Sequence, residues 1–216
     1  MSAILRTRIL KAAERAAIEL DGVQAELLER YLELLARWNR TINLTAVPLE
    51  SLPDTSLDRL LVEPLLAARF FPLTSTEWYD LGSGGGSPAI PLKILRPLAR
   101  LTMVESKSRK AAFLRQVIHS LHLTDIDVVE ARFQSLGQDR GNSADYLTVR
   151  AVRRDAALQL AAATLLRPGG RLLSFGTRSR TAFWTDFAIL ESCDLPGSED
   201  VLEVLVKEPV QHQILK

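Results

Sequence analysis

One segment of the sequence combines residue types that bind a nucleoside cofactor. Residues 80–88 read Asp-Leu-Gly-Ser-Gly-Gly-Gly-Ser-Pro and lie between a short apolar run and a segment with helical periodicity. Glycines let the backbone turn sharply and approach a ligand where a Cβ would collide, and a helix start favours a carboxylate or phosphate. Glu105 ends the next expected strand, where its carboxylate can accept hydrogen bonds from both hydroxyls of a ribose. Together these features predict a nucleoside-bearing cofactor at the strand ends.

The details of the loop favour one cofactor over another. The dinucleotide fingerprint requires a third glycine where this chain has Ser87, and it uses no acid two residues before the first glycine. Asp80 stands at that position, and it suits the cationic amino-acid tail of S-adenosylmethionine better than a pyrophosphate. The loop is therefore typical of the first motif of a class I methyltransferase. An NAD-dependent oxidoreductase is the less favoured alternative.

The surrounding elements change their period near residue 76. Before it, residues 24–40 and 56–71 show helical spacing. After it, short apolar runs alternate with helical segments, which indicates a mainly parallel sheet covered on both faces. The expected strands are residues 78–81, 101–104, 126–129, 146–149, 171–175 and 201–206, and the expected helices are residues 88–95, 108–121, 155–166 and 181–190.

The end of the chain breaks this alternation. An apolar stretch around residues 188–192 is joined to residues 201–206 by a segment containing Pro196 and Gly197, which leaves no room for a helix. This pair is therefore expected to form an antiparallel hairpin. The predicted fold class is α/β, a Rossmann-like class I methyltransferase with a mainly parallel seven-stranded sheet and a C-terminal antiparallel hairpin. Residues 1–76 are expected to form an N-terminal helical segment packed on the core, and residues 77–216 the methyltransferase core.

Composition excludes several other classes of site. The 216 residues include 27 Lys and Arg and 26 Asp and Glu, so the formal net charge is +1, and contact with nucleic acid must come from a local basic patch. Cys193 is the only cysteine, which excludes an intrachain disulfide, a thiolate zinc site and a cysteine-held iron–sulfur cluster. His119, His122 and His212 form no metal-binding pattern, so no metal is expected. No membrane span or secretory signal is visible, and a cytoplasmic protein is expected.

Most of the chain resembles one family, the RsmG (GidB) guanine-N7 methyltransferases of bacterial 16S ribosomal RNA. The most diagnostic segments are Trp38-Asn39 with Asn43-Leu44-Thr45, and Phe113-Leu114-Arg115-Gln116-Val117. Further matches are the glycine loop and residues 88–92, 105–110, 131–132 and 149–151. The resemblance implies S-adenosylmethionine as the cofactor, 16S ribosomal RNA or the small ribosomal subunit as the partner, no membrane contact, and a monomer.

The resemblance and the loop together give a set of candidate site residues. The expected cofactor-binding residues are Asp80, Gly82, Ser83, Gly84, Ser87, Glu105, Phe133, Gln134 and Arg150. Arg150 is also the candidate catalytic residue. The expected substrate-binding residues are Arg59, Arg109, Lys110, Arg153 and Arg154. All of these except Arg59 belong to basic groups that follow the strands, together with Lys107, Arg115, Arg178 and Arg180.

The chemistry of the acceptor agrees with a ring nitrogen. The segment after the fourth strand, residues 149–154, lacks the Asp/Asn-Pro-Pro-aromatic motif used for exocyclic amines, and Cys193 stands too late in the chain to act as a nucleophile on a pyrimidine carbon. Guanine N7 already carries a lone pair, so positioning replaces a catalytic base. Because A-form RNA hides N7 in a deep, narrow groove, the target guanine is expected to be unpaired.

The sequence departs from the family pattern on the side expected to meet RNA. Leu60 stands where a histidine is expected, Glu63-Pro64 replaces an Asp-Ser pair, Phe175 replaces a lysine, and Glu199-Asp200 replaces an Arg-His pair. Glu199 and Asp200 would repel phosphates if they faced the substrate. Two alternatives therefore stay open: a methyltransferase for a small-molecule acceptor, and a catalytically silent RNA- or ribosome-binding module.

Overall fold

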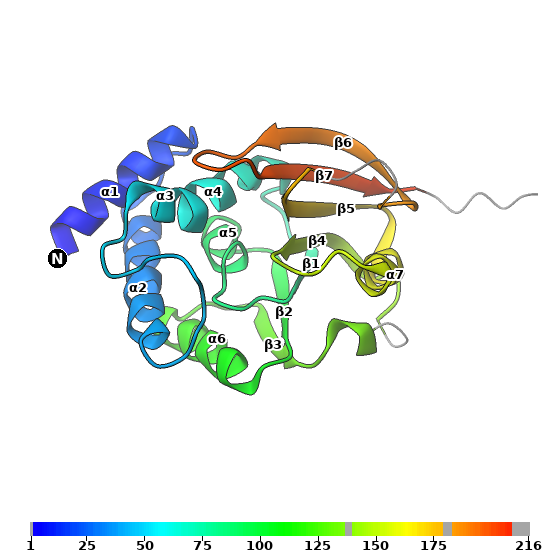
Figure 1. Ribbon diagram of the computed structural model, residues 1–216, viewed down its shortest axis with the longest axis horizontal. Helices are drawn as coiled ribbons and strands as arrows, with labels where there is room; N and C mark the ends of the chain where they lie inside the picture. Colours follow the sequence, from blue (N-terminus) through cyan, green and yellow to red (C-terminus); the bar gives the residue numbers. More distant parts are fainter. Residues whose placement is uncertain (1, 137–139, 179–182, 209–216) are drawn as a thin grey trace, which may run out of the picture.

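The computed structural model describes residues 2–136, 140–178 and 183–208, and it contains a sheet in the order β3-β2-β1-β4-β5-β7-β6 (Figure 1). The first five strands of the chain run parallel, while β7 is antiparallel to both β5 and β6. The predicted fold class is thereby confirmed. The strands are β1 (Glu77–Leu81), β2 (Arg100–Glu105), β3 (Ile126–Glu130), β4 (Ala144–Arg150), β5 (Leu166–Gly176), β6 (Phe187–Asp194) and β7 (Val201–Lys207).

The helices form layers on both faces of this sheet (Figure 1). Helices α5 (Ala89–Leu95), α6 (Ser108–Leu121) and α7 (Ala156–Leu165) connect the strands, and the short 3-10 helix η3 (Phe133–Ser135) follows β3. Helix α1 (Ser2–Arg15) packs on α2 (Gly22–Asn39), and α2 packs on α5 and α6. Asp21 caps the start of α2 through a reciprocal pair of hydrogen bonds with Gln24.

The expected helix over residues 56–71 is one helix with a change of pitch in the middle. It runs through α3 (Asp54–Leu57), the π-helical turn η1 (Asp58–Val62), α4 (Glu63–Ala67) and the 3-10 turn η2 (Ala68–Phe70). A π-turn inserts an extra residue into the helix and occurs frequently at functional sites. Here the π-turn places Arg59 and Leu60 near the carboxyl ends of the strands.

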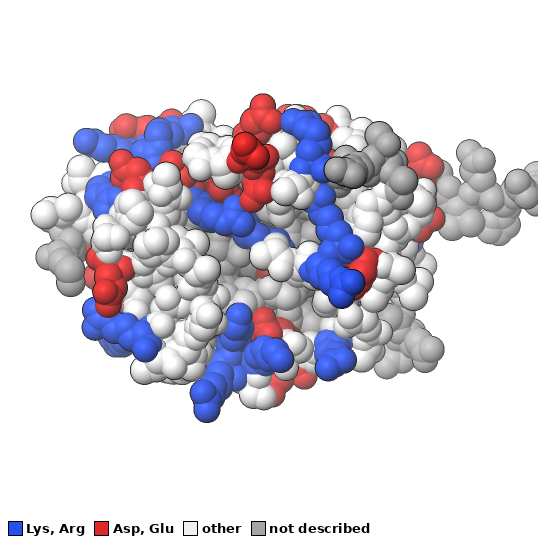
Figure 2. Space-filling view, in the orientation of Figure 1, with Lys and Arg blue, Asp and Glu red and all other residues white. Residues whose placement is uncertain are grey.

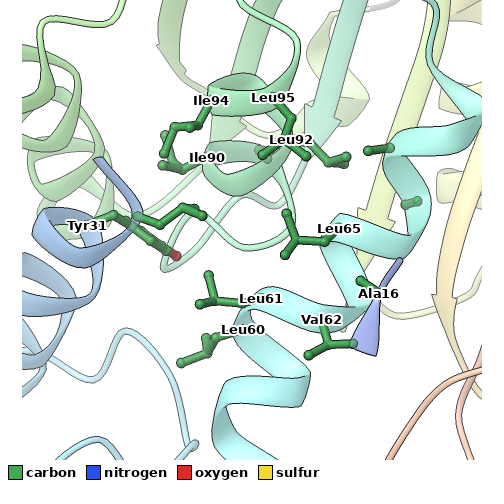
Figure 3. Close-up of a cluster of buried hydrophobic side chains, with 14 of the residues drawn as sticks. Ala16, Tyr31, Leu60, Leu61, Val62, Leu65, Ile90, Leu92, Ile94 and Leu95 are labelled. Atoms are coloured by element: carbon green, nitrogen blue, oxygen red, sulfur yellow. The ribbon is translucent and has the colours of Figure 1, made fainter. Parts of the chain in front are cut away.

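The N-terminal helices share a hydrophobic core with the sheet layer. Figure 3 shows Tyr31 from α2, Leu61 and Leu65 from the π-turn and α4, and Ile90 and Leu92 from α5 pointing toward one another. All five side chains are buried completely or almost completely. This core crosses residue 76, so the N-terminal segment is held against the sheet layer by apolar packing. The boundary near residue 76 stays a prediction.

One predicted helix is wrong. Residues 183–186 contain no helix, and Phe187–Asp194 forms the edge strand β6; residues 181–182 lie outside the described residues. The apolar residues of this stretch fit both helical and strand periodicity, and the stretch is a strand because it pairs with β7. Phe187 is buried beside Trp184. Both belong to a second hydrophobic cluster, which also contains Leu158, Ala161, Ala162 and Leu165 of α7. Within the described ranges, no helix has the length and apolarity needed to cross a bilayer.

Candidate functional site

A cavity of about 320 Å³ lies at the carboxyl ends of β1, β2 and β4. In Figure 2 Lys and Arg side chains lie around a central hollow on this face, with groups over α6 and near the segment between β4 and α7. Eight of the residues predicted from the sequence line the cavity: Arg59, Gly82, Ser83, Gly84, Ser87, Glu105, Lys110 and Arg150. The parallel strands bring them together because their carboxyl ends meet at one edge.

Two glycines of the loop stand where a residue with a side chain would not fit. The amides of Gly82 and Ser83 both donate to the carbonyl of Val104 at the end of β2, at 2.8 and 3.1 Å. Gly82 has a φ of +76°, and a Cβ there would lie 2.7 Å from the side chain of Val152. Gly86 has a φ of +86°, and its Cβ would lie 2.8 Å from Ile90. Both positions therefore need glycine.

Glu105 connects the loop to the end of β2. Its Oε2 accepts a hydrogen bond from the amide of Gly84 at 2.9 Å, and its Oε1 accepts one from the amide of Lys107 at 2.8 Å. An ionised carboxylate has about four acceptor sites, so the two oxygens keep capacity for further donors. Because Glu105 also lines the cavity, it is placed to accept hydrogen bonds from the hydroxyls of a ribose.

Asp80 lies behind the loop rather than in the cavity. Its carboxylate accepts a hydrogen bond of 2.5 Å from the hydroxyl of Thr148, which in turn accepts one of 3.0 Å from the indole of Trp78. Ser83 donates to the Asp80 backbone carbonyl at 3.0 Å. Burial raises the pKa of Asp80 to about 6, against the hydrogen bonds from Ser83 and Thr148 that favour its ionised form. Asp80 is 2% exposed and is not among the cavity-lining residues.

Arg150 lines the cavity next to Ser87 of the glycine loop. Its side chain is only 8% exposed, and its Nη2 donates to Glu63 Oε2 at 2.6 Å. Its Nη1 donates to the carbonyl of Arg59 at 2.7 Å and to the hydroxyl of Ser87 at 3.1 Å. The guanidinium lies 4.4 Å from the centre of the Phe175 ring, within the range of a cation–π contact. Arg150 is therefore fixed from three sides.

Burial controls the protonation of this pair. It lowers the pKa of Arg150 to about 10 although Glu63 acts in the opposite direction, so the guanidinium stays charged at neutral pH. Burial also raises the pKa of Glu63, and the nearby Arg150 and Arg59 oppose that shift. Among the described residues nothing accepts a hydrogen bond from the buried Nε of Arg150. One donor of a cavity-lining cation therefore has no protein partner in the described structure.

The departures from the family pattern gather around Arg150 and Arg59. Glu63 and Phe175 contact Arg150, and Asp200 pairs with Arg59 at 2.8 Å. Leu60 lines the cavity. Arg59 offsets the charge of Asp200, and the repulsion of phosphates by Glu199 and Asp200 stays a prediction.

Several predicted site residues lie outside the cavity. Phe133 packs against the second hydrophobic cluster, and Gln134 on the same short helix is exposed. Arg109 and Arg153 are exposed on the surface. Arg154 donates to the carbonyl of Thr177 and the hydroxyl of Ser174 and lies 3.6 Å from Glu203. Arg180, from the basic groups, lies outside the described residues. The exposed Arg109 and Arg153 fit a place on the surface around the cavity better than a place inside it.

The sequence analysis missed one wall of the cavity. Leu35 and residues 44–47 line it, although they precede the sheet by more than one helix. The signal was present, since Asn39 and Leu44-Thr45 belong to the segment singled out as diagnostic. What the sequence lacked was any indication that this segment folds over the glycine loop.

Curated relatives share this sequence over most of its length. A protein from Xanthomonas euvesicatoria pv. vesicatoria, named ribosomal RNA small subunit methyltransferase G, is 42% identical over 176 residues, which are 80% of this chain and 79% of that protein. A protein of the same name from Stenotrophomonas maltophilia is 40% identical over 161 residues, 74% of this chain and 72% of its own length.

Solved structures support the fold. A mutant of MtNAS in complex with S-adenosylmethionine aligns with a TM-score of 0.59 at 16% identity, over 96% of this chain and 77% of the other. A SAM-dependent methyltransferase from Aquifex aeolicus aligns with a TM-score of 0.54 at 10% identity, over 71% and 93% of the two chains. The sequence model of rRNA small subunit methyltransferase G matches residues 24–184. Together with the curated relatives, this match shows that the chain belongs to the rRNA small subunit methyltransferase G family.

Proposed function

We propose that this protein transfers a methyl group from S-adenosylmethionine to N7 of a guanine in 16S ribosomal RNA. Its family membership makes it an S-adenosylmethionine-dependent rRNA methyltransferase. The observation that carries the proposal is the cavity at the strand ends. The glycine loop and Glu105 form what we call the cofactor end, and Arg150 with its partner Glu63 forms what we call the acceptor end; the two meet where Arg150 donates to Ser87.

The residues at the first end fit the cofactor. Glu105 keeps acceptor capacity for the ribose hydroxyls, and the backbone of Gly82 and Gly84 allows close approach. S-adenosylmethionine supplies an electrophilic methyl group on a positively charged sulfur. Asp80 supports the glycine loop from behind, because its carbonyl accepts a hydrogen bond from Ser83 and its carboxylate accepts one from Thr148.

The residues at the second end fit a neutral ring as the acceptor. The N7 lone pair forms the new carbon–nitrogen bond while the carbon–sulfur bond breaks, so no residue has to remove a proton. The ring gains a positive charge in this step. An unbalanced arginine beside it would oppose that charge, but Glu63 and Asp200 offset Arg150 and Arg59. Arg150, held by these partners in the wall of the cavity, is then a fixed charged group beside the base.

The RNA backbone needs cations that are free to meet phosphates. Arg109 and Arg153 are exposed beside the cavity end of the sheet, and Lys110 lines the cavity itself. We assign phosphate contacts to these three residues rather than to Arg59 and Arg150. Binding of RNA should consequently weaken with salt.

The test is transfer of a tritiated methyl group from S-adenosylmethionine to small-subunit ribosomal RNA that lacks this modification, followed by mapping of the product by mass spectrometry. Naked RNA, isolated subunits and free nucleosides are compared as acceptors. We expect 7-methylguanosine at one position in the RNA and no reaction with nucleosides. Methylation of another atom would overturn the N7 assignment, and transfer only to nucleosides would favour a small-molecule acceptor. RNA binding without transfer would indicate a silent module.

We also propose that the protein acts as a monomer in the cytoplasm, where bacterial ribosomal RNA is made and assembled. A single cavity in one chain supplies both ends of the site described above. Light scattering of the purified protein, alone and with RNA, tests the oligomeric state.

A further inference from the structure

The wall that closes the cavity over the glycine loop comes from the segment after α2. Leu44, Thr45, Ala46 and Val47 all line the cavity. The backbone carbonyl of Leu44 lies 3.4 Å from the position that a Cβ would take at Gly85, which is ordinary contact distance. The glycine loop and this segment therefore face each other closely, without regular secondary structure in residues 43–45.

One side chain fixes the course of this segment. The Oδ1 atom of Asn39 accepts hydrogen bonds from the amides of Leu44 at 2.9 Å and Thr45 at 3.0 Å. The hydroxyl of Thr45 then accepts a hydrogen bond from the amide of Val47 at 3.1 Å. These bonds replace the ladder that a strand or helix would supply. The carboxamide of Asn39 is therefore the anchor of the wall.

The helix that carries Asn39 is itself fixed to the opposite wall. Tyr31, two turns earlier on α2, donates its hydroxyl to the carbonyl of Gly85 at 2.7 Å. Leu35, between them, lines the cavity, and its side chain lies 3.2 Å from the position of a Cβ at Gly85. One helix thus sets the spacing between the glycine loop and the wall across from it.

We propose that Asn39 is a positioning residue for the cofactor pocket, and that its carboxamide oxygen holds residues 44–47 at the distance the cofactor requires. The proposal rests on the assignment of this cavity to S-adenosylmethionine. Asn39 acts through the backbone of Leu44 and Thr45 and touches no reacting atom. Its loss should weaken the cofactor complex while leaving the acceptor end, with Arg150 and Glu63, in place.

The variants separate the oxygen from the rest of the side chain. Asn39→Ala removes the acceptor and leaves two amides unpaired, whereas Asn39→Asp keeps an oxygen at the same place. Thr41→Ala is the matched control, because Thr41 lies on the same segment, is exposed, does not line the cavity and donates its hydroxyl to the carbonyl of Trp38 instead of to the wall. Asn39→Gln moves the oxygen by one methylene and carries the test if Asn39→Ala does not fold.

The measurements are the Kd of S-adenosylhomocysteine by calorimetry, which needs no RNA, and KM for S-adenosylmethionine and kcat with ribosomal RNA. We expect Asn39→Ala or Asn39→Gln to raise both Kd and KM about tenfold with kcat nearly unchanged, from the loss of hydrogen bonds that order the wall. Asn39→Asp should restore both values, and Thr41→Ala should equal the wild type.

Two results would overturn the proposal. If Asn39→Ala or Asn39→Gln lowers the melting temperature but binds the cofactor like the wild type, Asn39 is structural only. If Asn39→Asp is as damaged as Asn39→Ala, the oxygen is not the anchor. Wild-type protein that binds no S-adenosylhomocysteine would instead remove the cofactor assignment itself, and this proposal with it.

Discussion

The two ends of the cavity are built in different ways. The cofactor end consists of backbone shaped by glycines and joined to one carboxylate, and its parts follow one another closely in the sequence. The acceptor end is an ion-pair network in which Glu63 and Arg150, 87 positions apart, meet at 2.6 Å. The first end depends on local geometry, while the second depends on buried charges that must balance. Mutations should therefore affect the first through ligand affinity and the second through folding and turnover.

Two buried carboxyls make this difference measurable. Asp80 at the cofactor end is hydrogen-bonded by the hydroxyl of Thr148, whereas Glu63 at the acceptor end is bonded by the guanidinium of Arg150. Burial of Asp80 outweighs the attraction of the nearby Arg150, whereas Glu63 bonds directly to that cation. The two carboxyls should therefore respond differently to mutation and to pH.

Removal of Glu63 should destabilise the fold most. In Glu63→Ala the guanidinium of Arg150 stays buried without its counter-ion, and breaking such a pair costs about 3–5 kcal/mol of unfolding free energy. Denaturant unfolding measures the loss. The control is Glu77→Ala, because the pair of Glu77 with Arg100 is about half exposed and its loss should cost at most about 1 kcal/mol. Equal losses in both variants would show that the acceptor end has no buried ionic network.

Asp80 should make stability depend on pH. Its pKa is raised to about 6 in the folded protein from 3.8, so the folded state binds the proton more tightly than the unfolded state. The resulting stabilisation is complete below about pH 4 and is lost as pH rises through about 6. Between pH 4 and 7.5, the wild type should lose roughly 2–3 kcal/mol relative to Asp80→Asn. A difference that stays constant with pH would contradict the burial of this carboxyl.

Glu105→Ala should weaken cofactor binding without a comparable effect on the acceptor end. Loss of charge-assisted hydrogen bonds worth roughly 1.5–3 kcal/mol corresponds to a tenfold or greater rise in Kd. Calorimetry with S-adenosylhomocysteine measures it. Glu130→Ala is the control, because Glu130 pairs in register with Glu105 on the neighbouring strand but is exposed. Unchanged affinity of Glu105→Ala would remove the ribose assignment.

The smallest expected effect is that of Asp200→Asn. Asp200 and Arg59 are partly exposed, so loss of the pair should cost less than about 1 kcal/mol of stability. The freed Arg59 should instead add about one phosphate contact and steepen the salt dependence of RNA binding by about 0.7 in log–log slope. The control is Asp54→Asn, because the exposed Asp54 pairs with Arg8, which is not among the basic groups after the strands, and it should leave the slope unchanged. The same slope in both variants would mean that Asp200 does not restrain Arg59.

The same contrast explains what the sequence could predict. Asp80, the glycines and Glu105 are close in sequence and belong to consecutive elements, so local pattern alone indicated a nucleoside site. The contacts of Glu63, Phe175 and Asp200 with two arginines depend on tertiary distances that no local pattern contains. These residues were therefore interpreted as weakening the acceptor side, whereas the structure shows them in contact with Arg150 and Arg59. Their effect on turnover is still a prediction.

The secondary structure shows a similar division. Strands and helices with one clear period, such as β2 and α6, were predicted with nearly correct bounds. Residues 187–190 fit two periods, and only pairing with β7 made them a strand. The wall formed by residues 44–47 has no period at all, because the side chain of Asn39 determines its course.

The most direct test of the account is a double variant, Arg150→Gln with Glu63→Gln, which removes both buried charges together and so limits the loss of stability. Cofactor Kd and kcat with small-subunit ribosomal RNA are measured on the same preparation, with the melting temperature as a check on folding. We predict a Kd close to that of the wild type and a kcat reduced about tenfold or more, because the charged group that positions the acceptor base is lost. Normal turnover would contradict the role of Arg150 at the acceptor, and an equal loss of cofactor affinity would contradict the separation of the two ends.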